Sequence, residues 1–313
     1  MKILIFGGTG FVGINIAAAL LARRHNVTMF DRVALPRAAL EAFAGYRDLL
    51  TFMQGDVTEH HSVERVIAGG FDTIILAAAI TAGPAREATD PQSILKVNLM
   101  AQLPILAAAR KSGVARIINL SSAAAYGTAG FRQKLLDEEI ACDPLSLYAV
   151  TKYASEKVAA RLAALWQADI ISVRLSAVFG PWERMTGVRD TPSPQMQILA
   201  ALRERKQAIL SRPGIRDWIH AEDVGNAVTL LIEAGKPRHG LYNISTGRQW
   251  SALQWGEALA ALHPGLVCRL AQSGETPTID LYSEADRAPL SVARMEEEFA
   301  GGRDLAAPIP RSI

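Results

Sequence analysis

The sequence has little cysteine, no excess of charge of one sign and no apolar run long enough to cross a membrane. Two cysteines in 313 residues, Cys142 and Cys268, predict neither a disulfide framework nor a metal site. The net charge of +2 offers no electrostatic basis for binding nucleic acid or a membrane surface. Strand-like sequence begins at Lys2 and leaves no room for a signal peptide, so we expect a cytoplasmic protein. Half of the residues are apolar, enough for a substantial core.

What the sequence does have is a glycine-rich segment at its start. An apolar run of strand length, Lys2–Phe6, is followed by four glycines within seven residues and then by a helical pattern. Glycine at these places permits a tight turn, lets backbone N–H groups approach a pyrophosphate, and lets the helix pack on the strand. The N-terminus of that helix adds free N–H groups and a positive dipole end. A simple turn is the alternative, but strand and helix on both sides favour a dinucleotide site at Gly7, Gly10, Phe11, Val12 and Gly13.

An acidic residue ends the second predicted strand, Asn26–Asp31. Asp31 stands eighteen residues after Gly13, where a carboxylate would accept hydrogen bonds from the hydroxyls of the adenosine ribose. The same carboxylate would repel a 2′-phosphate, so we expect NAD rather than NADP. Arg32 follows directly and could pair with such a phosphate, which leaves NADP open. A solvated acid at a strand end is the alternative interpretation.

Strands and helices alternate through the first half of the chain. We expect further strands at 50–55, 72–79 and 114–120, and helices near 59–68 and 91–112. This alternation predicts a doubly wound parallel sheet, the Rossmann fold, with right-handed crossovers. Ligands of such sheets bind at the carboxyl ends of the strands. Three alanines at one strand end would let a flat ligand lie against the backbone, although they would equally fit packing under a helix. The candidates at these ends are Asp56, Val57, Ala77, Ala78, Ala79, Ser121 and Ser122.

Tyr148 and Lys152 open a predicted helix over 147–166. Their spacing of four places both side chains on one face of the helix. An ammonium group near a tyrosine hydroxyl favours the phenolate and lowers the pKa of the tyrosine. Such a tyrosine can take a proton from an alcohol while a hydride leaves the carbon. An exposed helical pair is the alternative, because this spacing is common by chance.

These motifs, in this order, resemble the extended short-chain dehydrogenase/reductases, and among them the NAD-dependent epimerase/dehydratase family. The resemblance covers nearly the whole chain and includes the segments 174–181 and 216–224. It implies that Tyr148 is the catalytic acid/base and that Lys152 tunes Tyr148 and binds the nicotinamide ribose. It also implies that Ser122 binds the substrate hydroxyl and that Asn98 orders the site and the cofactor. The substrate candidates are Ser122, Tyr126 and Arg216.

Two departures from the family pattern reduce the number of reactions that we expect this chain to catalyse. Ala177 stands where nucleotide-sugar epimerases usually carry an asparagine that holds the sugar nucleotide, and no acidic pair follows Ser122-Ala123, which disfavours dehydration. We therefore expect hydride transfer to or from a secondary alcohol or ketone of a sugar-like small molecule. A nucleotide-sugar epimerase with tightly bound NAD is the alternative, and a non-catalytic NAD(P)-sensing scaffold is less favoured. Arg216 could hold a phosphate or carboxylate, or could pair with Asp217 beside it.

The second half of the chain is less regular. We expect an NAD-binding domain over 1–175, extended by segments near 215–245, and a mainly substrate-binding lobe over 176–313. The polar segment 182–194 is long enough to cover a ligand. The charged segment 280–311 is expected to wrap the surface, and Arg287 or Arg294 could reach the cleft.

The helices at 91–112 and 147–166 carry alanine and leucine on more than one face. Small residues on two faces allow a helix to approach both the sheet and a second copy of the chain. Related enzymes commonly dimerise through a bundle of these two helices. A homodimer is therefore expected.

Overall fold

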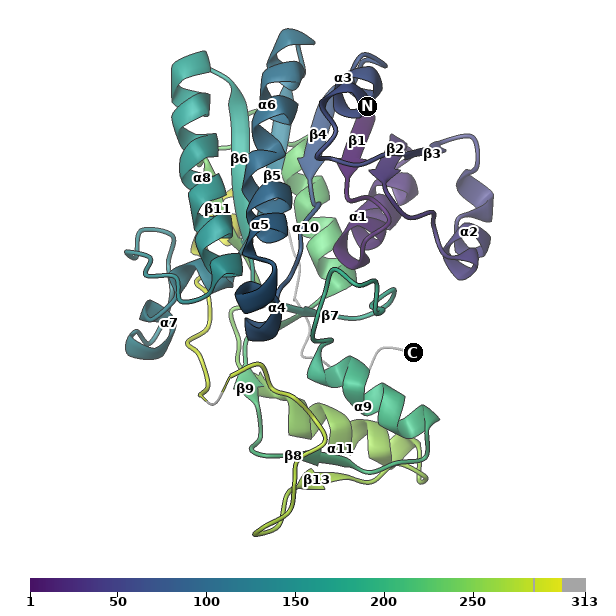
Figure 1. The fold of residues 1–313 in the computed structure, drawn as a ribbon, viewed down its shortest axis with the longest axis vertical. Helices are drawn as coiled ribbons and strands as arrows, with labels where there is room; N and C mark the ends of the chain where they lie inside the picture. Colours follow the sequence, from purple (N-terminus) through teal and green to yellow (C-terminus); the bar gives the residue numbers. More distant parts are fainter. Residues whose placement is uncertain (284, 300–313) are drawn as a thin grey trace.

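A seven-stranded parallel sheet forms the centre of the molecule (Figure 1). The computed structural model describes residues 1–283 and 285–299. The strand order is β11-β6-β5-β4-β1-β2-β3, so the direction of winding reverses between β1 and β4. This is the predicted doubly wound fold. The strands are β1 (Lys2–Phe6), β2 (Asn26–Asp31), β3 (Leu50–Gln54), β4 (Thr73–Leu76), β5 (Arg116–Ser122), β6 (Asp169–Leu175) and β11 (Leu241–Ile244).

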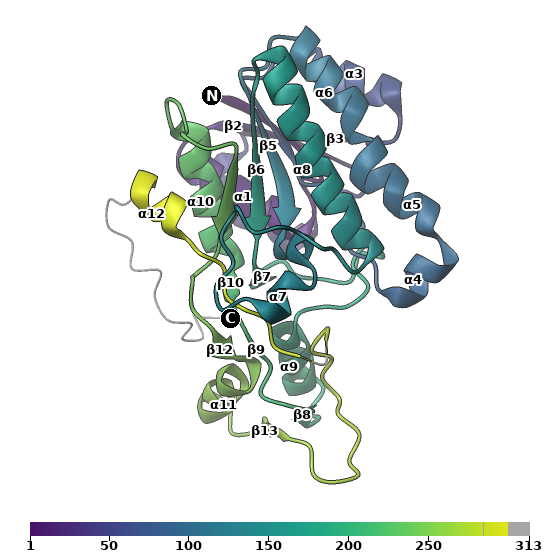
Figure 2. The same ribbon diagram turned by 90° about the vertical axis from the view of Figure 1, so that its left-hand side faces the viewer.

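Helices cover both faces of this sheet (Figure 2). On one face α1 (Phe11–Ala22) and α10 (Ala221–Glu233) pack on apolar side chains such as Ile3 and Ile5. On the other face α3 (His60–Ile67), α6 (Gln102–Lys111) and α8 (Leu147–Trp166) pack on Leu4 and Phe6. Consecutive residues of β1 are therefore buried on opposite faces, as expected for a strand in the middle of a parallel sheet.

A smaller lobe lies beyond the carboxyl ends of the central strands (Figure 1). It contains α9 (Pro194–Arg203), α11 (Ala252–Leu262) and the parallel pair β8 (Ala208–Leu210) and β13 (Cys268–Leu270). Its own apolar core gathers around Trp218 and Trp255. From the same half of the chain, β11 joins the central sheet beside β6, and α12 (Ala293–Phe299) packs near it. The domain boundaries at 175 and 176 stay a prediction, and residues 300–313 lie outside the described chain.

Two expected elements are divided in the structure. The helix expected over 91–112 consists of α5 (Pro91–Leu95), a π-helical turn at Lys96–Met100 and α6. Asn98 sits in that turn and bonds the backbone of a neighbouring segment, an arrangement typical of π turns near functional sites. The segment 215–220, which the sequence pattern predicts as a single strand, is divided at Asp217 into two strands. The first, β9 (Ile215–Arg216), pairs with β12 (Trp250–Ser251), and the second, β10 (Trp218–His220), pairs with β7 (Ala177–Phe179).

Three short helices were not expected: α2 (Arg37–Ala42), α4 (Pro84–Thr89) and α7 (Ala129–Arg132). Short helices of this kind bury little apolar surface of their own, so hydrophobic periodicity does not reveal them. None of the helices within residues 1–283 and 285–299 combines the length and the apolar character needed to cross a membrane.

Candidate active site

The turn between β1 and α1 forms a cradle of backbone that excludes side chains. Gly7 has a φ of +81°, and a Cβ there would stand 2.5 Å from the amide nitrogen of Ala78. A Cβ on Gly13 would stand 2.3 Å from the carbonyl oxygen of Gly7. Gly10 caps α1 without a side-chain hydrogen bond, and no acidic residue lies in the first turn. The positive end of α1 is thus available to an anion, so the cradle fits the pyrophosphate of a dinucleotide.

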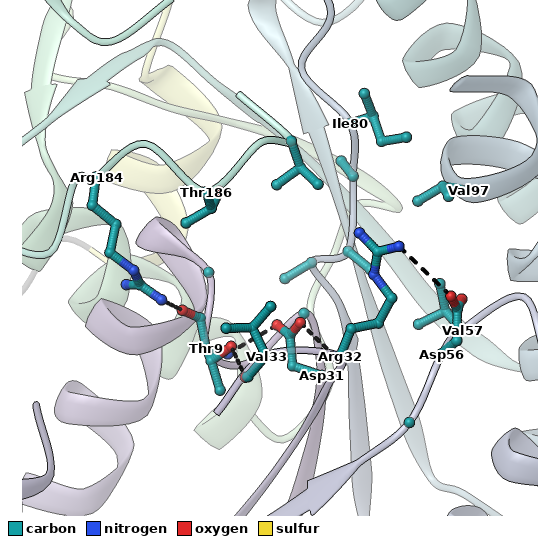
Figure 3. A pocket seen from close by; sticks show the side chains of 17 residues that line it. Thr9, Asp31, Arg32, Val33, Asp56, Val57, Ile80, Val97, Arg184 and Thr186 are labelled. Carbon is teal, nitrogen blue, oxygen red and sulfur yellow. Dashed lines mark hydrogen bonds and ion pairs between the residues drawn. The ribbon is translucent and has the colours of Figure 1, made fainter. Parts of the chain in front are cut away.

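A pocket beside this cradle has the character of an adenosine site (Figure 3). The Asp31 carboxylate accepts hydrogen bonds from the backbone nitrogens of Thr9, at 3.2 Å, and Arg32, at 2.7 Å. Each oxygen keeps a further lone pair for a ribose hydroxyl. The guanidinium of Arg32 lies 3.8 Å from the carboxylate of Asp56. The pocket is lined by the predicted Gly7, Gly10, Asp31, Arg32, Asp56, Val57, Ala77, Ala78 and Ala79, and by the unpredicted Thr9, Val33, Ile80 and Arg184.

A second, larger cleft of about 470 Å³ begins at the same glycine turn and runs toward the smaller lobe. Residues that are far apart in the sequence line it together. Its walls come from the start of α1, the ends of β4 and β5, the start of α8 and the segment around β9. The predicted residues in these walls are Gly7, Gly10, Phe11, Val12, Gly13, Ala77, Ala79, Ser122, Tyr148, Lys152 and Arg216.

The protonation of the Tyr148–Lys152 pair differs from the expectation. Burial lowers the pKa of Lys152 to about 8 and raises the pKa of Tyr148. The Lys152 ammonium lies 5.8 Å from the centroid of the Tyr148 ring and donates to the carbonyl of Leu120 at 2.8 Å. A hydrogen bond with Ser122 and the charge of Arg189 act against burial, because each lowers the pKa of Tyr148. The prediction that Lys152 lowers the pKa of Tyr148 is therefore corrected, because burial raises that pKa and the groups that oppose burial are Ser122, Arg189 and Thr81 rather than Lys152.

Asn98 lies behind the cleft wall. Its side chain is fully buried, accepts a hydrogen bond from the nitrogen of Ile80 at 2.7 Å and donates to the carbonyl of Ile80 at 3.0 Å. It also donates to the hydroxyl of Thr151 at 3.2 Å. Asn98 thus ties the segment after β4 to α8 and does not line the cleft, and its role in ordering the site and the cofactor stays a prediction.

Tyr126 is a core residue. Its hydroxyl lies 2.9 Å from the carbonyl of Asp137 and 2.9 Å from Oδ1 of Asn243, and the guanidinium of Arg174 lies over its ring. Burial raises its pKa to about 12. The prediction that Tyr126 contacts substrate is therefore wrong, because its polar group is turned inward and already bonded.

The segment 182–193, here called the cleft loop, lies across the cleft. Arg184 donates to the carbonyl of Thr9 at 2.7 Å. On the other side, Thr81 donates its backbone N–H to the carbonyl of Val188 at 2.7 Å and accepts from the N–H of Asp190 at 3.1 Å. The loop therefore joins the glycine turn to the segment after β4. Its length and polarity predicted a covering role, but nothing in the sequence singled out Arg184 or Val188.

Two arginines, Arg216 and Arg287, bring positive charge to the end of the cleft that faces the smaller lobe. Arg216 lies between the rings of Trp218 and Tyr282, at 5.7 and 5.6 Å, and donates to the hydroxyl of Ser283 at 3.1 Å. Burial and the neighbouring charge of Arg287 lower the pKa of Arg216 to about 10. Within residues 1–283 and 285–299, no carboxylate forms an ion pair with either arginine. The pair thus suits an anionic ligand.

The alternative partner of Arg216, Asp217, is bonded elsewhere. Its carboxylate accepts from the nitrogen of Leu290 at 2.9 Å and the hydroxyl of Thr246 at 3.0 Å. Arg287 reaches the cleft as expected and donates to the carbonyl of Gly127 at 3.2 Å. Arg294 does not line the cleft, and donates instead to the carbonyl of Leu241. No cluster of His, Cys, Asp or Glu suited to a metal ion occurs in the part of the chain that the structure describes.

Comparison with known proteins agrees with this geometry. The model of the NAD dependent epimerase/dehydratase family matches residues 3–245. The UDP-glucose 4-epimerase of Corynebacterium glutamicum is 27% identical over 268 residues, which cover 81% of this chain and 78% of the relative. A dTDP-glucose 4,6-dehydratase of Mycobacterium tuberculosis is 24% identical over 239 residues, covering 75% and 70%.

Solved structures share the fold over almost the full length. The UDP-glucose 4-epimerase of Thermus thermophilus in complex with NAD superposes with a TM-score of 0.74 at 24% identity, covering 96% of this chain and 93% of that one. The UDP-glucuronic acid 4-epimerase of Bacillus cereus superposes with a TM-score of 0.79 at 19% identity, covering 97% and 95%. Together with the family match, the cradle and the paired Tyr148 and Lys152 identify the chain as a member of the NAD-dependent epimerase/dehydratase family, an NAD-dependent enzyme of the extended short-chain dehydrogenase/reductase type.

Proposed function

We propose that this enzyme transfers a hydride between NAD and a secondary alcohol or ketone of a sugar-like substrate, with Tyr148 as the acid/base. The observation that carries the proposal is that Tyr148 and Lys152 line the same cleft as the glycine cradle. Bound NAD supplies the hydride acceptor. In the oxidation direction the Tyr148 phenolate takes the alcohol proton, and in the reverse direction the Tyr148 hydroxyl gives that proton back to the ketone oxygen. The Ser122 hydroxyl hydrogen-bonds the same substrate oxygen. Lys152 lies one helical turn further on, and its ammonium would bind the ribose of the nicotinamide in the loaded enzyme.

The substrate, we propose, carries an anionic group. Arg216 and Arg287 bring two guanidinium groups to one end of the cleft, and no carboxylate pairs with either in the described residues. Burial, and then repulsion by the like charge of Arg287, lower the pKa of Arg216. A carboxylate or phosphate on the substrate would relieve this repulsion and orient the reacting carbon toward Tyr148.

Replacing Tyr148 with phenylalanine tests the proposed reaction. The variant keeps the ring and its packing but cannot exchange a proton, so turnover should fall at least about a hundredfold. NAD binding, followed by calorimetry, should stay close to that of the parent protein. Tyr153→Phe is a matched control, since Tyr153 lies on the same helix but does not line the cleft. Turnover by Tyr148→Phe at the parent rate would remove Tyr148 from the mechanism.

A nucleotide-sugar epimerase is the second candidate, favoured by the similar proteins that are UDP-glucose 4-epimerases. Against it stands Ala177 in place of the asparagine expected for that class. In an epimerase the cofactor is reduced and reoxidised within one cycle, so UDP-glucose should be converted without net NADH. A dehydrogenase should instead produce NADH absorbance with sugar acids or other polyols. The two measurements, made on the same preparation, separate the candidates.

We further propose a homodimer formed through the helices at 91–112 and 147–166, and a cytoplasmic location. The outer surfaces of α6 and α8 support the first proposal, because Leu103, Val150 and Leu165 are exposed there. The absence of a disulfide framework in the sequence supports the second.

A further inference from the structure

Arg189 of the cleft loop lies where three parts of the cleft meet, a position that no motif indicated. Its guanidinium lies 5.6 Å from the ring centroid of Phe11, at the start of α1. It donates to the hydroxyl of Tyr282 at 3.1 Å and pairs with the carboxylate of Glu183 at 3.1 Å. It lines the same cleft as Tyr148. Arg189 thus links the cofactor cradle, the acid/base residue and the C-terminal part of the described chain.

The backbone holds Arg189 in this place through Thr81. The two residues form a parallel bridge, in which Thr81 donates to the carbonyl of Val188 and accepts from the N–H of Asp190. Thr81 also lines the cleft, and its side chain hydrogen-bonds Tyr148. The residue that contacts the Tyr148 hydroxyl therefore also fixes the register of the cleft loop.

The other charged groups near Tyr148 are directed elsewhere. Lys152, on α8, donates to the carbonyl of Leu120. Glu87, on α4, accepts from the backbone nitrogen of Tyr148 at 3.2 Å, at the start of α8. Glu183 accepts from both the nitrogen and the hydroxyl of Ser193. The positive charge of Arg189, by contrast, lowers the pKa of Tyr148 against the effect of burial.

We propose that Arg189 is a positioning residue of the acid/base centre, whose guanidinium stabilises the ionised hydroxyl of Tyr148. The proposal rests on the proposed function, in which Tyr148 exchanges the proton. It adds that the stabilising cation comes from the cleft loop. Formation of the reactive phenolate then depends on the loop being folded across the cleft.

Titration of Tyr148 in the NAD-loaded protein tests this proposal without a substrate. The ultraviolet absorbance of tyrosinate is followed against pH, and the Tyr148→Phe variant in the same background is subtracted. Arg189→Gln should raise the midpoint for Tyr148 by about one pH unit, since removal of a neighbouring opposite charge commonly has an effect of this size. Arg189→Lys keeps a cation and should shift the midpoint less.

Glu183→Gln is the matched control. It breaks the same ion pair and leaves the cation in place, so it should not raise the midpoint. An unchanged midpoint in Arg189→Gln, an equal rise in Glu183→Gln, or no Tyr148-dependent step in the parent protein would each overturn the proposal. Calorimetric NAD binding reports whether each variant is folded. Because turnover is not measured, failure here leaves the turnover test of Tyr148→Phe as a separate result.

Discussion

At the scale of single residues, Asp31 is the group that should select the cofactor. Figure 3 shows its carboxylate at the edge of the adenosine pocket, with the Arg32 side chain directed toward Asp56. Replacing Asp31 with alanine removes two hydrogen bonds to a charged acceptor and the repulsion of a 2′-phosphate. NAD affinity should fall at least about tenfold, and NADP affinity should rise, both measured by calorimetry. Asp48→Ala, on the exposed surface, should change neither affinity. A variant that keeps the parent preference would show that Asp31 is only a solvated acid.

At the scale of elements, the packing of α10 on α1 should determine how firmly the cradle is held. A Cβ on Gly225 of α10 would stand 2.5 Å from the carbonyl oxygen of Asn15 and 3.2 Å from Cβ of Ala19, both in α1. Gly225→Ala should therefore lower the free energy of unfolding by about 1–3 kcal/mol. It should also weaken NAD binding, because displacing α1 moves the first-turn N–H groups. Gly235→Ala is the control, since a Cβ there meets open space. Equal unfolding midpoints for the two variants would contradict this account of the packing.

At the scale of the whole molecule, the proposed dimer makes a prediction about mass. Val150 and Leu165 of α8 are 41% and 57% exposed, so both apolar side chains are available to a partner helix. Light scattering should give twice the 33.7 kDa of one chain. Val150→Glu should lower that mass, whereas Val267→Glu, at an exposed valine of the smaller lobe, should leave it unchanged. A parent protein with the mass of one chain would rule out the dimer.

Several features of the site could be predicted because the interactions behind them are local. The glycine turn follows from local backbone geometry, since Gly7 has a φ of +81° and a Cβ on Gly13 would collide with the carbonyl oxygen of Gly7, six residues earlier. The shared face of Tyr148 and Lys152 follows from the geometry of a single helix. The position of Asp31 follows from one strand beside the first. Each of these expectations needed only one element or two adjacent ones.

The sequence by itself thus determined the doubly wound fold, the NAD site and the presence of a tyrosine–lysine pair. Only the tertiary structure decided which polar side chains reach the cleft. Tyr126 is turned inward to meet Asn243, 117 residues away, while Arg189 and Tyr282, 93 residues apart, meet at the cleft. The tertiary structure also decided the direction in which the pKa values of Tyr148 and Lys152 shift, because the burial of a side chain depends on every segment that packs around it. Long-range packing leaves no periodic pattern in the chain, so these features become visible only when the chain is folded.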